Sequence, residues 1–496
     1  AATTQPAPRP LLCTMTHVYY DAVVVGSGPN GLAAAIVLRQ AGLSVLLLEG
    51  KPTIGGGLRT AELTLPGFRH DICSAVHPMA MASPFFQTLP LARYGLEYLT
   101  PPVAAAHPFD DGTAAAAFGT VDDTARTLGP DAARYHRLLD ELVEHWPALA
   151  PDVLAPLRFP QHPVRMARFG LSALQPATLL GGGFRTQAAR GLFAGMAAHA
   201  IQPLTNIATS AIGLVLLAAA HRPGGWPIPR GGSQAIADAL AAHFRAIGGH
   251  IETSTLITSW AQLPKARAVL FDITPAQLLR IQGINLSRAY EWQLRRYRYG
   301  MGVFKIDWAL SSPIPWTASE ARQAGTLHLG GTLEEITATE AASARGHHPD
   351  NPFVLLAQPT VLDPTRAPAG RHTAWAYCHV PNGSTLNRTA AIETQVERFA
   401  PGFRDLILGR ATLDTAQMEA YNPNYVGGDI NGGIIDVGQL YTRPALRVSP
   451  YRTSRAGVYV CSSATPPGGG VHGMCGYHAA TRALRDVFGM KAAPLR

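Results

Sequence analysis

The clearest pattern of apolar and polar positions lies between residues 20 and 49, where two short apolar runs flank a helical pattern. Residues 22–25 are a valine-rich run, which is followed by the glycine-rich step Gly26-Ser27-Gly28-Pro29-Asn30-Gly31. An apolar helical pattern then extends to residue 41, and residues 45–48 form a second apolar run that ends at Glu49. A strand, a turn, a helix and a second strand in this order predict a βαβ unit of a parallel sheet.

The glycines of this turn have the spacing of a dinucleotide-binding loop. Gly26 permits a tight turn, Gly28 lets a pyrophosphate approach the backbone, and Gly31 lets the helix pack closely on the sheet. Glu49 lies about 20 residues beyond them, where a carboxylate binds a ribose hydroxyl and repels the 2′-phosphate of NADP. The pattern favours a dinucleotide site over the alternative, which is a glycine-rich turn in an ordinary α/β domain.

Two further glycine-rich segments are candidates for contact with the same ligand. The first reads Gly55-Gly56-Gly57-Leu58-Arg59, and its arginine could neutralise a pyrophosphate beside the first turn. In the second, an apolar strand over residues 457–461 precedes a glycine-rich turn over residues 468–473 and a helix to residue 484. N–H groups at the start of that helix would stabilise the negative charge of a reduced flavin. The three segments together favour a flavin dinucleotide.

The rest of the pattern divides into a helical part and a strand-rich part. Residues 163–220 read as helices, and their longest apolar stretch, residues 207–220, is too short to span a bilayer. A helix over residues 234–247, a strand-like run over 250–260 and a strand over 268–273 then resume the α/β pattern. Beyond residue 303 alternating runs predict a mostly antiparallel sheet. Residues 422–424 and 427–433 form a long turn-rich segment, which suits either a ligand border or a surface loop.

We therefore predict an α/β fold with a Rossmann-type FAD-binding domain that is assembled from discontinuous segments. A second, α+β domain would bind substrate and would contain the mostly antiparallel sheet and a helical insertion. Residues 19–80, 225–285 and 445–496 are assigned to the first domain, and residues 81–224 and 286–444 to the second. Residues 1–18 are interpreted as a disordered leader or a non-native remnant.

Composition narrows the classes of partner. Of the 496 residues, 47% are hydrophobic and 15% charged, which describes an ordered protein with a large core. The formal net charge is +8, but the basic residues are scattered, so we expect no nucleic-acid partner. An anionic membrane is a better match, and Arg165 and Arg168 beside apolar residues could form an amphipathic surface. The alternative there is a core-facing helix with exposed arginines.

The five cysteines are widely spaced and form no CxxC or zinc pattern. We interpret them as reduced thiols of a cytoplasmic protein, which could associate peripherally with a membrane. His347 and His348 have no spaced carboxylate or cysteine partners, so no metal site is predicted. The oligomeric state cannot be derived from the sequence.

The chain resembles the phytoene desaturase-like family of FAD-dependent oxidoreductases from residue 20 to its end. The resemblance rests on VVVGSGPNGLAAAIVLRQAGLSVLLLE, IGGGLRT, GGWPIPRGGSQAIADAL, GGDINGG and GVYVCSSATPPGGGVHGMCGYHAA. These motifs look closer to the branch with carotenoid ketolase-like and pyridine nucleotide-disulphide oxidoreductase domain 2-like proteins. One departure is the step Ser462-Ser463-Ala464-Thr465-Pro466-Pro467, which replaces a more usual Thr-His-Pro and puts the ribityl contacts in question.

The resemblance implies FAD as cofactor and assigns roles by position. Gly26, Gly28 and Gly31 would hold the pyrophosphate, Glu49 the ribose, and the backbone of Ile257 the adenine. The full set of implied FAD contacts is Gly26, Ser27, Gly28, Pro29, Asn30, Gly31, Glu49, Gly56, Gly57, Leu58, Arg59, Ile257, Ser463, Gly470, Val471 and His472.

The main functional hypothesis is a dehydrogenase or desaturase that transfers a hydride from an apolar, conjugated or lipid-like substrate to flavin N5. His472 is the first candidate for proton transfer or flavin polarisation, and His70, His77 and Tyr477 follow it; a structural role is the alternative for each. Two rival functions stay open. The flavin could oxidise amines or alcohols or serve an isomerase, or the protein could be a non-catalytic flavin-bound scaffold or lipid-binding partner.

Overall fold

In the computed structural model, which describes residues 19–440 and 442–495, five parallel strands form the sheet that carries the first glycine turn. The order across this sheet is β16 (Val458–Val460), β10 (Ala266–Phe271), β1 (Tyr20–Val25), β2 (Val45–Leu48) and β9 (His250–Glu252). Because its strands come from three distant stretches of chain, the sheet is discontinuous, as predicted. The predicted leader over residues 1–18 lies outside the described residues.

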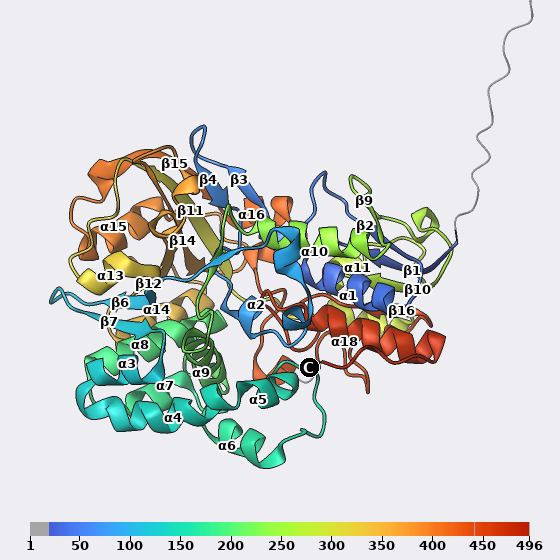
Figure 1. The fold of residues 1–496 in the computed structure, drawn as a ribbon, viewed down its shortest axis with the longest axis horizontal. Coiled ribbons are helices and arrows are strands. Elements are labelled where there is room, and N and C mark those ends of the chain that lie inside the picture. The colour runs from blue at the N-terminus through green and yellow to red at the C-terminus, as the bar shows by residue number, and fades with distance from the viewer. Residues whose placement is uncertain (1–18, 441, 496) are drawn as a thin grey trace, which may run out of the picture.

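Helices cover both faces of this parallel sheet, on the right of Figure 1. Alternate residues of a strand point to opposite faces, so Val24 packs toward one layer of helices and Val23 toward the other. The first layer contains α1 (Pro29–Gln40), α10 (Gln234–Ala246) and α18 (Met474–Ala483), and the second contains α11 (Pro275–Leu278) and α12 (Arg288–Arg295).

A seven-stranded sheet forms the other half of the molecule. Its order is β15 (Ile407–Leu413), β11 (Gly302–Leu310), β14 (His372–Val380), β13 (Val354–Ala357), β12 (Ala324–Leu329), β6 (Val103–Pro108) and β7 (Ala114–Phe118). Only the pair β12 and β6 is parallel, which confirms a mostly antiparallel sheet. Strands β6 and β7 were not predicted, because their alanine-rich sequences have low strand propensity.

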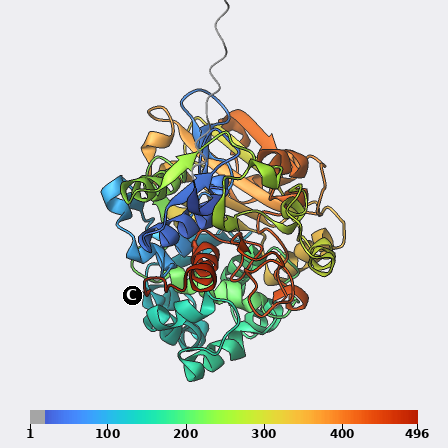
Figure 2. The same ribbon diagram turned by 90° about the vertical axis from the view of Figure 1, so that its right-hand side faces the viewer.

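The helical insertion lies below this sheet in Figure 1, and its cyan and teal helices stand at the same end in Figure 2. Helix α9 (Thr209–Ala220) is almost wholly buried, as predicted for the apolar stretch. Among the described residues no helix is long and apolar enough to cross a membrane. The helices are α3 (Val121–Thr127), α4 (Ala132–Glu144), α5 (Trp146–Val153), α6 (Pro163–Ala173), α7 (Ala177–Gly182), α8 (Gln187–Ala197) and α9 (Thr209–Ala220).

A buried ionic cluster joins the two halves. Asp71, at the end of β4 (Arg69–Asp71), pairs with Arg366 at 2.8 Å and accepts a hydrogen bond from the Ser233 N–H at the start of α10. Lys305 and Asp307, both on β11, form a second buried pair. Because burial makes an unpaired charge costly, this cluster fixes the second sheet against the helix layer of the first.

The strand-like run over residues 250–260 was predicted too long. Strand β9 ends at Glu252, and Ser254 has a φ of 56°, which breaks the extended backbone. Ile257, which was expected within this strand, therefore lies in the irregular segment that follows it.

Candidate functional site

One cavity of about 1440 Å³ extends from the first glycine turn to the helical insertion and the second sheet. Three glycine-rich segments, residues 26–30, 56–59 and 469–472, line it together. The first segment follows β1, and the third precedes α18, which packs against α1. The close packing requires a glycine, because a Cβ atom on Gly476 would lie 1.9 Å from the Asn30 carbonyl oxygen.

The structure brings nearly all of the residues expected at FAD to this one cavity. Gly31 is the exception: it lies behind the wall, where a Cβ atom would meet the Gly26 carbonyl oxygen at 2.0 Å. The expected residues on the wall are Gly26, Ser27, Gly28, Pro29, Asn30, Glu49, Gly56, Gly57, Leu58, Arg59, Ile257, Ser463, Gly470, Val471 and His472.

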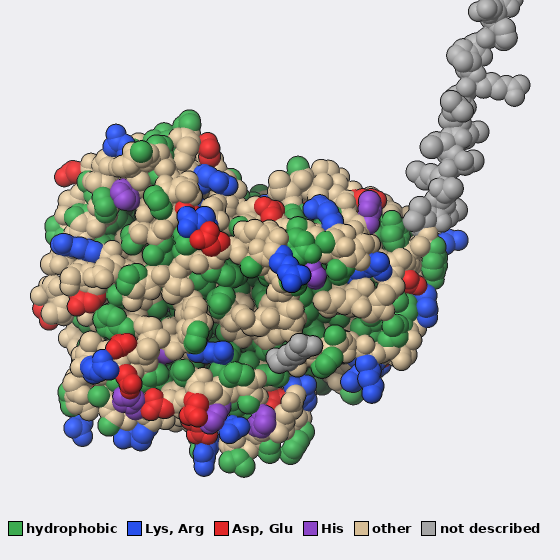
Figure 3. Space-filling model, viewed as in Figure 1, with side chains coloured by type: hydrophobic (Ala, Val, Ile, Leu, Met, Phe, Trp, Pro, Cys, Tyr) green, Lys and Arg blue, Asp and Glu red, His purple; other side chains and the backbone are tan. Residues whose placement is uncertain are grey.

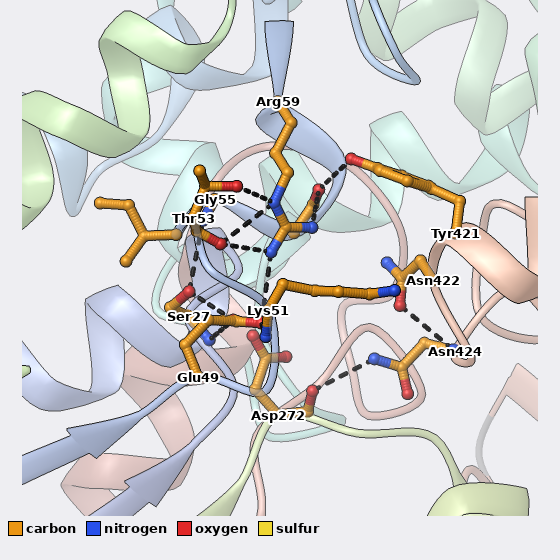
Figure 4. A network of polar contacts seen from close by, with 12 residues as sticks. Ser27, Glu49, Lys51, Thr53, Gly55, Arg59, Asp272, Tyr421, Asn422 and Asn424 are labelled. Carbon is orange, nitrogen blue, oxygen red and sulfur yellow. Dashed lines mark hydrogen bonds and ion pairs between the residues drawn. The ribbon is translucent and has the colours of Figure 1, made fainter. Parts of the chain in front are cut away.

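Glu49 anchors a polar network at the glycine-lined end, which Figure 4 shows from close by. Its Oε2 accepts hydrogen bonds from the Ser27 N–H and hydroxyl, and its Oε1 accepts from the Lys51 N–H at 2.8 Å. The Arg59 guanidinium lies 3.2 Å from the same Oε1. The carboxylate is 7% exposed, so these donors compensate its loss of water.

The Arg59 side chain makes more contacts within the protein than the sequence indicated. Its guanidinium donates to the Thr53 and Gly56 carbonyl oxygens as well as to Glu49, and it lies 5.7 Å from the centre of the Tyr421 ring. The side chain therefore neutralises Glu49 and holds the second glycine loop in place. Its charge still faces the cavity beside the first turn.

Asp272 is an acidic residue of the cavity that the sequence analysis did not select. It follows β10 directly, and its Oδ2 accepts a hydrogen bond from the Gly31 N–H at 2.9 Å. Burial raises the pKa of Asp272 to about 7, and the nearby Glu49 adds to this rise, whereas N–H groups of the glycine turn oppose it. Asn424 contacts the backbone of Asp272 and Thr274 beside it, in the turn-rich segment that borders the cavity.

His472 reaches the cavity but its ring is already engaged. It is 1% exposed, and its Nδ1 accepts a hydrogen bond from the Met474 N–H at 3.0 Å. Burial lowers the pKa of His472 to about 4, although the Gly469 and Gly468 carbonyls favour the protonated ring. A neutral ring with these contacts braces the turn before α18, which favours the structural alternative over proton transfer.

The other candidates for proton transfer are placed less favourably. His77 lines the cavity, but its Nε2 is bound to the Ser233 hydroxyl at 2.7 Å, and burial lowers its pKa to about 4. His70 lies at the ionic cluster, 3.5 Å from Asp307, and Tyr477 packs on Phe85 instead of on the cavity wall. The structure thus brings the predicted cofactor residues other than Gly31 to one cavity. Of the proton-transfer candidates, His472 and His77 line this cavity with rings that are already hydrogen-bonded, whereas His70 and Tyr477 do not line it.

The opposite end of the cavity is apolar. Met166 and Phe169 from α6 and Ile212, Val215 and Leu216 from α9 form one side of it. On the other side, β14 contributes Trp375 and Tyr377, whose rings meet edge to face at 5.2 Å and 89°. Sequence reasoning considered Met166 and Phe169 only as part of a possible lipid surface and did not select the residues of α9 and β14, because helical spacing and strand alternation mark buried positions without telling a core from a cavity wall.

Comparisons with known proteins agree with this architecture. Residues 24–88 match the model of an NAD(P)-binding Rossmann-like domain. The pyridine nucleotide-disulfide oxidoreductase domain-containing protein 2 of Rattus norvegicus is 25% identical, over 95% of this chain and 94% of the relative. One of the subunits of limonene dehydrogenase from Castellaniella defragrans is 34% identical over 24% of this chain and 22% of its own.

A solved structure of putrescine oxidase bound to putrescine has a TM-score of 0.61 and 19% identity, covering 95% of this chain and 100% of its own. The chain has the α/β fold of these oxidoreductases. At such identities the likeness to solved structures establishes the fold, and the chemistry has to be argued from the cavity.

Proposed function

We propose that this protein is an FAD-dependent oxidoreductase that oxidises an apolar, lipid-like or conjugated substrate. The observation that carries the proposal is one continuous cavity, which is lined by three glycine-rich segments at one end and by apolar side chains at the other. A dinucleotide at the first end would then adjoin a substrate at the second. The apolar compound in the name of the Castellaniella relative, limonene, is consistent with this substrate class.

The residues at the glycine-lined end fit FAD. A Cβ atom on Gly56 would lie 3.0 Å from the Gly28 Cα, so side chains at these loops would fill the groove that a pyrophosphate needs. Glu49 stands at the end of β2, where a ribose hydroxyl can add to its hydrogen bonds. The Asn30 Oδ1 is buried without a hydrogen-bond donor among residues 19–440 and 442–495, and a ligand hydroxyl would satisfy it.

FAD, when bound, supplies the oxidant, since its N5 accepts a hydride. The apolar wall of α6, α9 and β14 would bind the substrate, orient the reacting C–H bond and exclude water. Residues 469–472 and the start of α18 would present backbone dipoles to the negative charge that develops on reduction. The engaged ring of His472 would hold this turn in place. The proton that the substrate loses together with the hydride would pass to solvent water, so no dedicated base is required of this ring.

Amine oxidation is a second candidate, which the aromatic pair Trp375 and Tyr377 favours. Aromatic faces attract a cationic amine, and the structurally similar putrescine oxidase is named for an amine. The Lys305 ammonium, however, already lies 5.8 Å from the centre of the Trp375 ring and would repel a second cation there. An amine substrate would also gain from a free carboxylate, but Asp152, an acid on the cavity wall, is already paired with Arg158 at 2.9 Å. The apolar class is therefore the preferred one.

Anaerobic reduction of the FAD-loaded protein tests the function and separates the two substrate classes. Monoterpenes, polyenes and alkyl amines would be added in turn while the absorption of oxidised flavin is recorded. We expect an apolar hydrocarbon to bleach the flavin and amines to leave it oxidised. Bleaching by amines alone would establish the second candidate, and a flavin that no compound reduces would support the scaffold alternative and contradict the proposal.

Peripheral membrane contact belongs to this proposal, because an apolar substrate would reach the cavity from a lipid phase. The cavity is lined in part by α6 and the segment before it, and this part of the chain carries Leu157, which is 77% exposed, and Leu171, which is 75% exposed. Figure 3 shows hydrophobic side chains beside basic ones at this lower edge of the molecule. Arg165 would meet anionic headgroups, whereas Arg168 is paired with Glu141 at 3.2 Å.

Flotation with anionic liposomes at low salt tests this contact. We expect the protein to float and the double variant Leu157→Asp, Leu171→Asp to stay in the dense fraction. A matched control, Leu256→Asp, changes an exposed leucine on the nucleotide-binding side and should float like the wild type. Failure of the wild type to float would contradict the membrane contact and leave the redox proposal in place.

A further inference from the structure

Asp272 places a carboxylate against the first glycine turn, on the side of the cavity where a dinucleotide would bind. The Gly31 N–H donates to its Oδ2, and a Cβ atom on Gly28 would lie only 2.7 Å from the same oxygen. The aspartate thus packs against the first glycine turn at the start of α1, on the wall of the cavity. A helix start of this kind binds one anion readily, and here a side chain of the protein is that anion.

The charged group that shifts the pKa of Asp272 is negative. Glu49, at the end of β2, raises this pKa, and the Arg59 guanidinium on the cavity wall is already paired with Glu49. The Lys51 ammonium, on the same wall, donates to the Ala420 carbonyl oxygen at 3.4 Å. On the side of β16 and α18 stand Cys461 and Cys475, whose thiols are buried and whose pKa values are raised, so they stay neutral. From the turn-rich segment the contact is made by Asn424, an uncharged amide.

An ionised Asp272 and a pyrophosphate would therefore share one small, partly dehydrated site. Two like charges at close range in such surroundings repel each other strongly. A protonated carboxyl group has no such conflict, and its O–H can donate a hydrogen bond to a phosphate oxygen, which a carboxylate cannot do.

We propose that Asp272 is a further cofactor-contacting residue and that FAD binds the form of the protein in which this carboxyl group is protonated. The inference rests on the proposed FAD site. It adds that an ionised Asp272 takes up a proton when FAD binds. Affinity for FAD then decreases as the pH rises through the titration of Asp272. Burial lowers the pKa values of the cavity histidines His77, His199 and His472 to about 4, 3 and 4, so they stay neutral in this range.

The test is the dissociation constant of FAD, measured by quenching of FAD fluorescence between pH 6 and pH 8. With a pKa of about 7, the protonated fraction of Asp272 falls from about nine-tenths to about one-tenth, so we expect about tenfold weaker binding at pH 8. The variant Asp272→Asn keeps the size and stays neutral, and it should bind FAD equally well at both pH values. Asp272→Ala should also abolish the pH dependence, and it covers the case in which the asparagine variant does not fold.

The matched control is Glu252→Gln, an exposed acid at the end of β9 in the same sheet, which should keep the tenfold change. Equal affinity of the wild type at pH 6 and pH 8 would overturn the role of Asp272 and leave the FAD site standing. The same holds if Asp272→Asn keeps the wild-type pH dependence. If neither the wild type nor any variant binds FAD at either pH, the proposed function itself is overturned, and the inference with it.

Discussion

The two ends of the cavity are built in different ways. At the glycine-lined end the ligand would meet backbone groups and a fixed network of Glu49, Ser27 and Arg59, in which each polar atom has a partner. At the other end it would meet apolar side chains of α6, α9 and β14 without such a network. Ligand binding at the first end therefore depends on backbone geometry, and at the second end it depends on the space between apolar side chains. Substitutions at the two ends should have different consequences.

The largest effect should come from separating the two halves at the ionic cluster. Arg366→Met leaves Asp71 buried without its cation, which should lower the free energy of unfolding by about 4 kcal/mol. Thermal or urea denaturation measures the loss, and Arg371→Met, at an exposed position five residues along the chain, is the control. Equal stability of both variants would show that the cluster does not hold the halves together.

A smaller loss is expected when the backbone geometry of the glycine turn is changed. Gly31→Ala places a Cβ atom 2.0 Å from the rigid Gly26 carbonyl oxygen, and we expect a loss of about 2–3 kcal/mol together with loss of FAD binding. Gly170→Ala in α6 has no atom within 4 Å of the new Cβ and should stabilise the helix by about 0.5–1 kcal/mol. Wild-type FAD affinity of the Gly31 variant would refute the geometric account of this end.

The same contrast explains what the sequence could predict. The cavity residues Gly26, Glu49 and Arg59 could be predicted to lie together because the turn chemistry is local and follows a fixed spacing. Asp272 was missed although an acid directly after a buried strand, at the carboxyl edge of a parallel sheet, was a usable signal.

The apolar end could not be predicted, because its wall is assembled from segments far apart in the chain. Trp375 alternates on β14 like any buried strand residue, and only the packing of α9 opposite it leaves a cavity there. His472 was selected as a polar residue beside a helix start, and its engagement with the Met474 N–H depends on a turn conformation that composition does not specify.

At the apolar end, a bulkier side chain should affect the substrate and spare the cofactor. Ile212→Trp would fill part of the cavity beside α9. We expect an apolar compound to reduce the bound flavin at least tenfold more slowly, which corresponds to an activation free energy about 1.4 kcal/mol higher. The dissociation constant of FAD should stay unchanged. Ile207→Trp, at a half-exposed position before α9, is the control, and an equal loss in both variants would contradict the assignment of the wall.

The smallest effect concerns pH and a histidine outside the cavity. Burial lowers the pKa of His221 from 6.5 to about 4, so the unfolded chain binds a proton in this range before the folded one does. The contribution of the neutral His221 ring to the stability of the folded protein is therefore complete above pH 6.5, and it is lost as the pH falls toward 4. The wild type should lose free energy of unfolding between pH 7 and pH 5.5. We expect this loss to be about 1 kcal/mol smaller in the variant His221→Gln.

Denaturation curves at both pH values measure this difference. His250→Gln, whose imidazole is 59% exposed, is the control and should leave the pH dependence as it is in the wild type. An unchanged dependence in the His221 variant would show that this ring does not contribute to acid destabilisation.

The central claim is that one cavity holds a dinucleotide at its glycine-lined end and an apolar ligand at the other. The most direct measurement is a crystal structure of the protein grown with FAD. The account predicts the pyrophosphate at residues 26–30, the ribose at Glu49 and the flavin ring between residues 469–472 and the apolar wall. FAD bound outside this cavity, or with its flavin ring turned away from the apolar wall, would contradict the account.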